Sequence, residues 1–290
     1  MEANKTLGRL YLAGIRGINA LDRICIDDVL NGNILPACLA KDTVEHLAQK
    51  RIPEHAWNST ELMDRARIEL ERYEHAGIHC VSFFDPWYPE LLRETARPPY
   101  LLYVRGRPEA LGGKCLTMVG TRYPTGLGLE TAKTLAMEAA RLGYTVVSGL
   151  ARGIDTASHF GAVGERSTTV AVLGSGIDYV YPASNTRLAE RMLECGGAVV
   201  SEYPALFKPG KYTFPERNRI LAGMSAATLV VEAPEGSGAL ITADFALEEG
   251  REVCVSSLCL ETSRSAGCRK IVQEGANPIA SVRDILKQYA

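Results

Sequence analysis

Residues 211–253 hold the side chains whose types and spacing best suit the binding of an anion. The segment carries an arginine–asparagine–arginine triplet at 217–219 and, after a short apolar run, a glycine loop at 235–238. A strand, a glycine turn and a helix form the arrangement with which α/β proteins bind phosphate, because the N–H groups of the turn and the helix dipole favour negative charge. The segment therefore predicts a site for phosphate or another anion.

Three earlier turns repeat this arrangement and are predicted to serve the same site. Glycine lets the backbone approach an anion closely, and arginine presents a planar pair of donors that suits phosphate. A tight turn with a solvated arginine remains an equal alternative for the first of them, whose spacing is not G-x-G-x-x-G. The turns contain Gly120, Thr121 and Arg122; Gly149, Arg152 and Gly153; and Gly174, Ser175 and Gly176, with Asn185 and Arg187 at the start of the next helix.

Residues 205–219 mix cations with aromatic rings, and Glu216 is the only acid among them. Cations that follow phosphates and rings that stack on bases suit single-stranded nucleic acid. The alternative is a solvated loop whose rings dock on the core. Because the net charge of the chain is −2, a nucleic-acid-binding protein of this composition must concentrate its positive charge locally. The side chains concerned are Lys208, Lys211, Arg217 and Arg219, with Phe207, Tyr212 and Phe214.

Glu202 and Glu232 each end an apolar strand pattern, so they are expected near the site. Paired carboxylates can perform acid–base catalysis. They can equally hold Arg217 or Arg219 in ion pairs that build the site, and we favour this second interpretation.

His159 lies in the helix that follows the second glycine turn, and Asp155 is expected to cap that helix. No nucleophile is obviously paired with this histidine, so a structural role is favoured over that of a general base. We assign no catalytic residue, no metal ligand and no cofactor, and we expect a binding protein, not an enzyme.

The composition is that of a soluble globular protein. At 290 residues the chain can bury a sizeable core in one large domain or in two. No apolar stretch approaches the ~20 residues that span a bilayer, and the N-terminus lacks the apolar segment of a signal peptide, so a cytoplasmic protein is expected. The eight cysteines include no C-x-x-C pair, which favours reduced, mostly buried thiols over a disulfide framework or a zinc site.

The first 75 residues show helical spacing and little strand signal. They predict a small helical domain of the SAM or helix-hairpin-helix kind, and a packing or protein-interaction role is favoured over contact with nucleic-acid backbones. Asn58 is expected to cap the last of these helices. Residues 78–84 then predict a short strand, and a connector with four prolines ends in a second strand at 100–104.

From Cys115 onward, short apolar strands alternate with helices. This alternation predicts an α/β fold with a mostly parallel sheet covered on both faces. Right-handed crossovers place every strand-to-helix loop at one rim, where open α/β sheets bind their ligands. The four glycine turns are therefore predicted to meet there.

Several ordered motifs run from residue 85 to residue 276: DPWYPELL with PPYLLYVRG, VGTRYPTGLG, SGLARGIDTASHFGA, AVLGSGIDYVYPASN, SEYP, FPERNRILAGMS, VVEAPEGSGALITA and GREV. Together they resemble the DNA-processing protein A (DprA or Smf) family. The resemblance implies an extended Rossmann-like domain, over residues 76–290, that binds single-stranded DNA and forms homodimers. It also implies a recombination mediator, since members of that family load RecA recombinase onto incoming strands during natural transformation and no chemical reaction is established for them.

Matching the motifs one by one gives the residues expected to contact nucleic acid, to which the charge pattern adds Arg187 and Lys211. The resemblance departs from the family at Ala183, where a lysine is common, and at Arg269 and Ile271, where asparagine and leucine are usual. Many members continue into a winged-helix domain, which is not expected here because the chain stops at Ala290. The matched residues are Arg122, Gly149, Arg152, Gly153, Gly174, Gly176, Asn185, Arg217, Asn218, Arg219, Gly236, Ser237 and Gly238.

A nucleotide-binding sensor or enzyme is the alternative function. The stretch PEGSGALITADFALEEG distantly resembles the P-G-G-x-G-T-x-x-E loop of lysine-decarboxylase-like phosphoribohydrolases. However, Glu235 replaces a glycine, and Asp244 stands where a catalytic glutamate would be sought. A NAD-dependent dehydrogenase is a weaker interpretation, because the G-x-G-x-x-G fingerprint and its downstream acid are missing.

Overall fold

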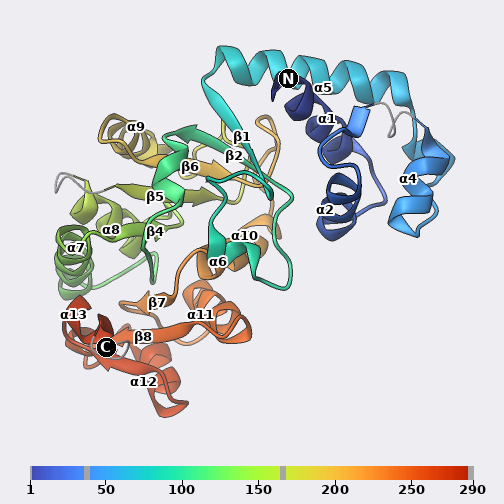
Figure 1. Cartoon of the computed structure of the whole chain (residues 1–290). Coiled ribbons are helices and arrows are strands. Elements are labelled where there is room, and N and C mark those ends of the chain that lie inside the picture. The colour runs from blue at the N-terminus through green and yellow to red at the C-terminus, as the bar shows by residue number, and fades with distance from the viewer. Residues whose placement is uncertain (1, 36–39, 164–167, 287–290) are drawn as a thin grey trace. The chain divides into compact units, whose positions relative to one another are not determined.

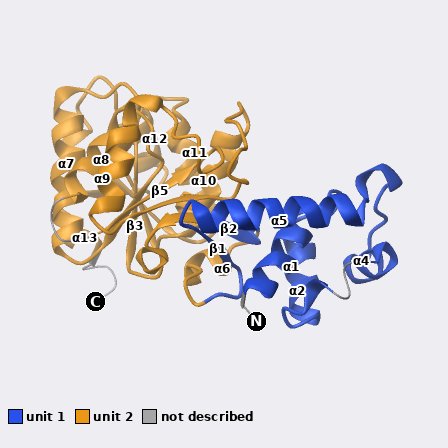
Figure 2. Cartoon of the chain, turned by 90° about the horizontal axis from the view of Figure 1, so that it is seen from above, with its two compact units in different colours: residues 1–85, 97–102 blue, residues 86–96, 103–290 orange. Residues whose placement is uncertain are grey.

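The computed structural model describes residues 2–35, 40–163 and 168–286 (Figure 1). The chain divides into two compact units, which Figure 2 colours separately. Unit 1 comprises residues 1–85 and 97–102, and unit 2 comprises residues 86–96 and 103–290. Within the described ranges, no helix combines the length and the apolar character needed to cross a membrane.

Unit 1 is mainly helical, as the spacing of its apolar residues predicts. Two of its helices begin at asparagine caps: Asn19 accepts from the N–H of Asp22, which completes a capping box, and Asn58 accepts from the N–H of Glu61. The second of these caps is the one expected from the sequence. The elements are α1 (Glu2–Gly14), α2 (Ala20–Val29), α4 (Lys41–Ala48), the 3₁₀ turn η1 (Glu54–Ala56), α5 (Ser59–His75) and β1 (Ile78–Ser82).

A buried ion cluster stabilises unit 1. Asp27 is 1% exposed, and it accepts from Arg9 Nε at 3.0 Å and from the Tyr100 hydroxyl at 3.0 Å. A second nitrogen of Arg9 donates to Asp85 at 2.9 Å. The buried carboxylate of Asp27 therefore has both a charge partner and a neutral donor, as a charge removed from water requires.

The strands follow the order β1-β2-β6-β5-β4-β3-β7-β8-β9. β2 starts in unit 1 and continues in unit 2, where it pairs antiparallel with β6, while the pairings from β6 to β9 are parallel. This confirms the predicted α/β class with a mostly parallel sheet. The strands are β2 (Leu101–Gly106), β3 (Cys115–Val119), β4 (Thr145–Ser148), β5 (Thr169–Leu173), β6 (Ala198–Ser201), β7 (Ala227–Val230), β8 (Glu252–Ser256) and β9 (Asn277–Ile279).

Helices cover both faces of the sheet (Figure 1). In β3, Leu116 and Met118 belong to the buried cluster formed with α7 and α8, whereas the Thr117 hydroxyl donates to the Leu221 carbonyl of α10. Successive residues of a strand point to opposite faces, so β3 contacts helices on each side. The helices and 3₁₀ turns are α6 (Glu90–Arg93), η2 (Pro108–Leu111), α7 (Gly126–Arg141), α8 (Ile154–Ala162), η3 (Ala183–Asn185), α9 (Thr186–Glu194), α10 (Thr213–Gly223), α11 (Gly238–Glu248), η4 (Ser257–Cys259), α12 (Ala266–Gln273) and α13 (Val282–Leu286).

The connectivity reverses beside β3. From β3 the chain proceeds through β4, β5 and β6 on one side, and then returns to add β7, β8 and β9 on the other. The carboxyl ends of β3 and β7 therefore form a topological switch point, which is where open α/β sheets leave a crevice for ligands. All the glycine turns identified in the sequence follow parallel strands and lie at this rim.

The proline-rich connector and the cysteines differ in detail from expectation. Of the aromatic residues of the connector, Tyr88, Tyr100 and Tyr103 are buried, whereas Trp87 is 43% exposed. The strand predicted at 78–84 ends earlier, at Ser82. Among the described cysteines four are buried (Cys115, Cys254, Cys259 and Cys268), Cys80 is half-buried, and Cys25 and Cys195 are exposed; Cys38 lies outside the described residues.

Candidate functional site

Two adjoining pockets open at the switch point of unit 2. The larger has a volume of about 570 Å³ and lies between the turn after β3, the start of α10 and the loop that leads into α11. The smaller, of about 320 Å³, lies between the turns after β3 and β4 and residues 181–184. Both are lined by Arg122, Tyr123, Ala151, Phe214 and Arg217. The segment 211–253 thus forms one wall of a compound site, opposite Arg122.

The predicted cations fall into two classes, exposed and buried. Arg122, Arg152 and Lys211 are exposed and line the pockets, and they make no ion pair within the described residues. Arg187 is exposed but lines neither pocket. In contrast, Arg217 and the two residues after it are 5–8% exposed. Only the first class can offer a guanidinium or ammonium group to an incoming anion without rearrangement.

Arg217 joins the loops that surround the pockets. Its Nη1 donates to the carbonyl of Gly149 at 2.9 Å and to the carbonyl of Val172, and its Nε donates to Asn218 at 3.1 Å. A Cβ atom added at Gly149 would lie 2.5 Å from this guanidinium. Gly149 is therefore required for the arginine to fit, which gives it a packing role that the sequence did not suggest.

Asp155 compensates the buried charge of Arg217. Burial lowers the pKa of Arg217 to about 10, and attraction to Asp155 opposes that shift, so the guanidinium stays charged at neutral pH. Burial also raises the pKa of Asp155, while Arg217 and the backbone N–H groups of Ala151 and Gly149 counteract it. Asp155 lies within α8 and accepts from these two N–H groups at 3.3 and 3.2 Å. It thus holds the preceding turn and does not cap the helix as predicted.

The prediction that the strand-end acids pair with arginines is confirmed for one of them. Arg219 donates through Nη2 to both oxygens of Glu202 and through Nε to Glu216 at 2.8 Å. For Glu232 the prediction is wrong, because this carboxylate accepts from Thr125 and Thr262. Three strands separate β6 from β7, so the two glutamates end strands that are not neighbours.

The carboxylate of Glu232 occupies the anion position at the first glycine turn. It accepts from the N–H of Thr125 at 2.7 Å, at the start of α7, and a Cβ added at Gly128 would lie 2.4 Å from it. A helix N-terminus is the place where a dinucleotide fold binds pyrophosphate. Here the chain fills that place with its own negative charge. The first turn therefore offers the side chain of Arg122, and not these helix donors, to a ligand.

Several other predicted residues join loops to one another. Gly176 donates its N–H to the Phe207 carbonyl at 2.7 Å, and a Cβ at Gly174 would lie 2.8 Å from Phe214. The amide of Asn185 donates to the Leu150 carbonyl and to Thr156, both at 2.8 Å. These contacts hold the loops around the pockets in place without lining up donors for a ligand. Gly153, with a φ of +79°, would bring a Cβ to 2.4 Å from the Thr121 carbonyl.

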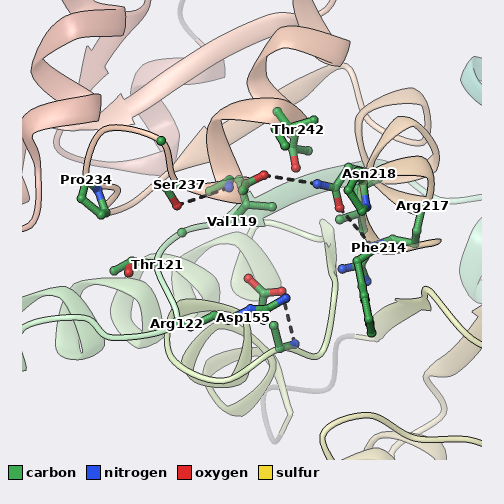
Figure 3. A pocket seen from close by; sticks show the side chains of 18 of the residues that line it. Val119, Thr121, Arg122, Asp155, Phe214, Arg217, Asn218, Pro234, Ser237 and Thr242 are labelled. Atoms are coloured by element: carbon green, nitrogen blue, oxygen red, sulfur yellow. Dashed lines mark hydrogen bonds between the residues drawn. The ribbon is translucent and has the colours of Figure 1, made fainter. Parts of the chain in front are cut away.

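The loop at 236–238 is the glycine turn that remains open. Figure 3 shows Ser237 and Asn218 on one side of the larger pocket, with Arg122 and Asp155 on the other. Ser237 caps α11, and Asn218 donates to the Gly238 carbonyl at 3.2 Å. No atom lies within 4 Å of a Cβ built at Gly236 or at Gly238. This loop alone among the four turns leaves room for a ligand against its backbone.

Aromatic side chains complete the lining: the sequence predicts Phe214 as a ring among the cations, whereas it does not predict Tyr123 and Tyr181 as site residues. Phe214 lines both pockets, the guanidinium of Arg122 lies 5.9 Å from its ring centroid, and the ring of Tyr181 lies 5.4 Å away. Tyr123 is 70% exposed at the edge of both pockets. The sequence offered one indication of Tyr123 as a site residue, namely its position directly after the arginine of a glycine turn.

His159 has the structural role that the sequence favours. It is fully buried, and its Nδ1 lies 2.7 Å from the Thr169 hydroxyl. That hydroxyl donates its single proton to the Val146 carbonyl, so Nδ1 must be the donor to Thr169. The Nε2 atom is buried without a partner in the described ranges. Burial, and to a lesser extent Arg217, lowers the pKa of His159 to about 3.

The described residues contain no cluster of three or more histidine, cysteine or acidic side chains able to hold a metal ion. Among the pocket-lining residues, the carboxylates are Asp155, whose contacts are internal, and the exposed Glu235. Exposed cations therefore surround Phe214, which lines both pockets. This arrangement suits a polyanion that also carries aromatic groups.

Comparison with known proteins identifies relatives over about three quarters of the chain. The family described as DNA recombination-mediator protein A matches residues 79–290. DNA processing protein DprA of Bacillus subtilis is 38% identical over 220 residues, which cover 76% of this chain and 74% of that protein. Protein Smf of Synechocystis is 39% identical over 75% of this chain, which spans about half (55%) of that relative's length.

Two solved structures are similar to this one. DNA processing protein A of Streptococcus pneumoniae superposes with a TM-score of 0.79 at 30% identity, and the match covers 97% of each chain. DNA processing protein A of Helicobacter pylori gives a TM-score of 0.66 at 25% identity, over 74% of this chain and 96% of that one. The latter structure was described for its single-stranded DNA binding mode.

Removing the buried guanidinium should destabilise the fold, whereas removing the exposed one should not. Arg217→Ala leaves the buried carbonyls of Gly149 and Val172 without this donor and removes the nearby positive charge that favours the buried Asp155 carboxylate, so we expect a loss of about 3–5 kcal/mol in the free energy of unfolding. Arg122→Ala should change it by no more than about 0.5 kcal/mol. Urea denaturation measures both. Equal losses would show that burial does not separate the two arginines.

The low pKa of His159 should make stability depend on pH. Its folded-state pKa of about 3 lies below the ordinary value of 6.5, so between these values the unfolded chain binds more protons and unfolding becomes easier as the pH falls. His159→Asn keeps a donor toward Thr169 and removes the titrating ring. From pH 7 to pH 5, the variant should lose about 2 kcal/mol less than the parent protein. Identical pH profiles in urea denaturation would contradict this.

Proposed function

The chain belongs to the DNA recombination-mediator protein A family, and on this premise we propose that it binds single-stranded DNA across the two pockets and acts as a recombination mediator. The observation that carries the proposal is the placement of Arg122, Arg152 and Lys211 around Phe214. Few acids oppose these cations, because the lining contains only Asp155, which accepts from backbone N–H groups, and Glu235. A DNA strand supplies what this lining lacks, namely phosphates for the cations and bases for the rings.

The phosphate contacts come from exposed side chains. Arg122 lies between the two pockets, Arg152 lines the smaller one and Lys211 the larger one. A strand that crosses both pockets meets all three in turn. The open loop at 236–238 adds backbone room on the far side of the larger pocket. Such contacts carry no sequence information, so the proposed binding tolerates any base order.

The base contacts come from the rings. Phe214 divides the pockets and is half-buried, with Tyr181 packed against it on the side of the smaller pocket. The guanidinium of Arg122 above its ring adds a planar surface that also stacks on bases. Neighbouring nucleotides would thus occupy the two pockets with Phe214 between them.

The buried triplet at 217–219 supports this function without direct contact with the DNA. Each is at most 8% exposed and is held by carbonyls or carboxylates of the surrounding loops. We assign them a positioning role: Arg217 holds the turn that carries Arg152, Asn218 holds the 236–238 turn, and Arg219 holds Glu202 at the end of β6. The same holds for Asn185 and for the glycines at 149, 153, 174 and 176, whose contacts lie within the protein.

The proposed activity is binding without chemistry. The carboxylate of Asp155 is buried and accepts from two N–H groups, and His159 is fully buried and lines neither pocket, so neither side chain presents a free base to the pockets. The volume of the larger pocket suits a single nucleotide, but Asp244, the residue sought as catalytic acid of a phosphoribohydrolase, is not among its lining residues.

Loss of one exposed cation should weaken DNA binding and lower its dependence on salt. For Arg122→Ala, Arg152→Ala and Lys211→Ala we expect weaker binding of a fluorescein-labelled oligothymidylate, measured by anisotropy. The slope of log K against log salt should become shallower by about 0.7 for each phosphate that the variant no longer neutralises. Lys133→Ala removes an exposed charge from α7, away from the pockets, and is the control. No binding by the parent protein at low salt would refute the proposal.

The family resemblance leads to a finer proposal: the protein, as a cytoplasmic homodimer, loads RecA recombinase onto incoming single strands during natural transformation. Its test is the rate at which RecA begins ATP hydrolysis on DNA coated with a single-strand-binding protein. Addition of the parent protein should shorten the lag, and Arg122→Ala should not. An unchanged lag, with DNA binding intact, would leave the DNA-binding proposal standing and refute the loading step.

A further inference from the structure

The segment 206–212, between β6 and α10, exposes an unusual amount of apolar surface. Leu206 is 58%, Phe207 42% and Tyr212 81% exposed, and Tyr212 is the most exposed of the large apolar side chains in the described ranges. None of the three lines either pocket. Exposed apolar groups gathered in one short segment mark a surface that is covered in use.

The segment is held in place at its first half. Phe207 donates its N–H to the Pro204 carbonyl at 2.9 Å and accepts through its own carbonyl from Gly176 at 2.7 Å. Its ring stacks on Tyr203, with 4.6 Å between the centroids and 15° between the planes. The ring is thus fixed on one side and still exposed on another. A ring that is ordered beforehand loses little conformational freedom when a partner stacks on it.

Charge identifies the partner. Lys208 and Lys211 are exposed within the segment, and residues 205–215 contain no acid. The ammonium of Lys211 lies 6.0 Å from the Tyr212 ring centroid. Rings interleaved with cations, and free of acids, match the alternating bases and phosphates of a single strand better than they match a protein surface.

Lys211 also connects the segment to the site already described. It lines the larger pocket, and Tyr212 follows it directly in the chain. Two residues farther on, Phe214 divides the pockets. A strand that leaves the larger pocket beside Lys211 therefore arrives at Tyr212.

We propose that residues 206–212 form an aromatic ledge, a second contact surface on which nucleotides stack after they leave the larger pocket. The proposal rests on the binding of single-stranded DNA in the pockets. If the ledge binds nucleotides, the affinity of the protein for single-stranded DNA rises as the strand becomes longer than the stretch held in the pockets. Because this additional affinity comes from stacking, it depends on salt less than the phosphate contacts do.

The test compares strand lengths. Oligothymidylates from about 3 to about 20 nucleotides cover the site sizes of other single-strand-binding folds, and anisotropy gives the affinity of each. Tyr212→Ala and Phe207→Ala/Tyr212→Ala should bind the shortest oligomers that the parent protein binds with unchanged affinity. On the longest oligomers they should lose about fivefold or more for each ring. The salt slope should stay that of the parent protein.

Two controls separate stacking from other effects. Tyr212→Phe keeps the ring and should keep the full gain with length. Leu247→Ala removes an exposed apolar side chain of α11 (63% exposed) and should change nothing. Melting temperatures confirm folding, and Tyr212→Ala alone is the safer variant because Phe207 also packs on Tyr203.

Each outcome is decisive. If the parent protein binds short oligomers but shows no gain with length, or if Tyr212→Ala retains that gain, the ledge is refuted while binding in the pockets stands. If the parent protein binds no oligomer, both proposals fail. If the double variant keeps its length dependence and instead loses binding to purified RecA, the segment is a protein-docking surface and the inference is overturned.

Discussion

The architecture of the site depends on one buried charge, the guanidinium of Arg217. It donates to the carbonyl of Gly149, directly after β4, and to that of Val172 within β5. Its charge is attracted to the carboxylate of Asp155, which in turn accepts from N–H groups of the turn after β4. Removing two charges from water is costly, and only a complete set of partners offsets that cost. The turn, the helix α8 and the helix α10 are therefore fixed relative to one another. Gly149 has no side chain because the guanidinium occupies that space.

The turn after the first parallel strand, β3, is closed to an external anion by the protein's own Glu232. Doubly wound folds use the first strand–helix turn for the pyrophosphate of a dinucleotide. Here Glu232 reaches that turn from the end of β7 and binds the donors of Thr125. The negative charge that the helix favours is thus internal. Under the proposed function, an external polyanion is therefore bound by exposed side chains, chiefly Arg122, and by the open loop at 236–238. A flexible strand, unlike a compact dinucleotide, can adapt to cations spread over a rim.

The sequence predicts the fold more completely than it predicts the site, for a physical reason. Alternation of apolar strands and helices is a local pattern, and it specifies the sheet class and the common rim. Strand order is not local, so the separation of Glu202 from Glu232 could not be foreseen. Burial is equally non-local: Arg122 and Arg217 both stand in motifs that predict a phosphate contact, yet Arg122 is exposed and Arg217 is only 5% exposed. This difference in exposure arises from the packing of α10 against the sheet, which the sequence does not reveal.

Electrostatics links these roles to a protein whose net charge is −2. An arginine that is paired inside the fold adds little to the field that an approaching strand experiences, since its charge is matched within a few ångströms. Arg219, held by Glu202 and Glu216, is of this kind. The local positive field must therefore come from Arg122, Arg152, Lys208 and Lys211, which have no such partners in the described part of the chain. Arg122, Arg152 and Lys211 line the two pockets, and Lys208 lies within the exposed segment 206–212. Under the proposed function, these exposed cations attract a DNA strand to one rim of a weakly acidic protein, and the rings of the proposed aromatic ledge then hold the strand by stacking.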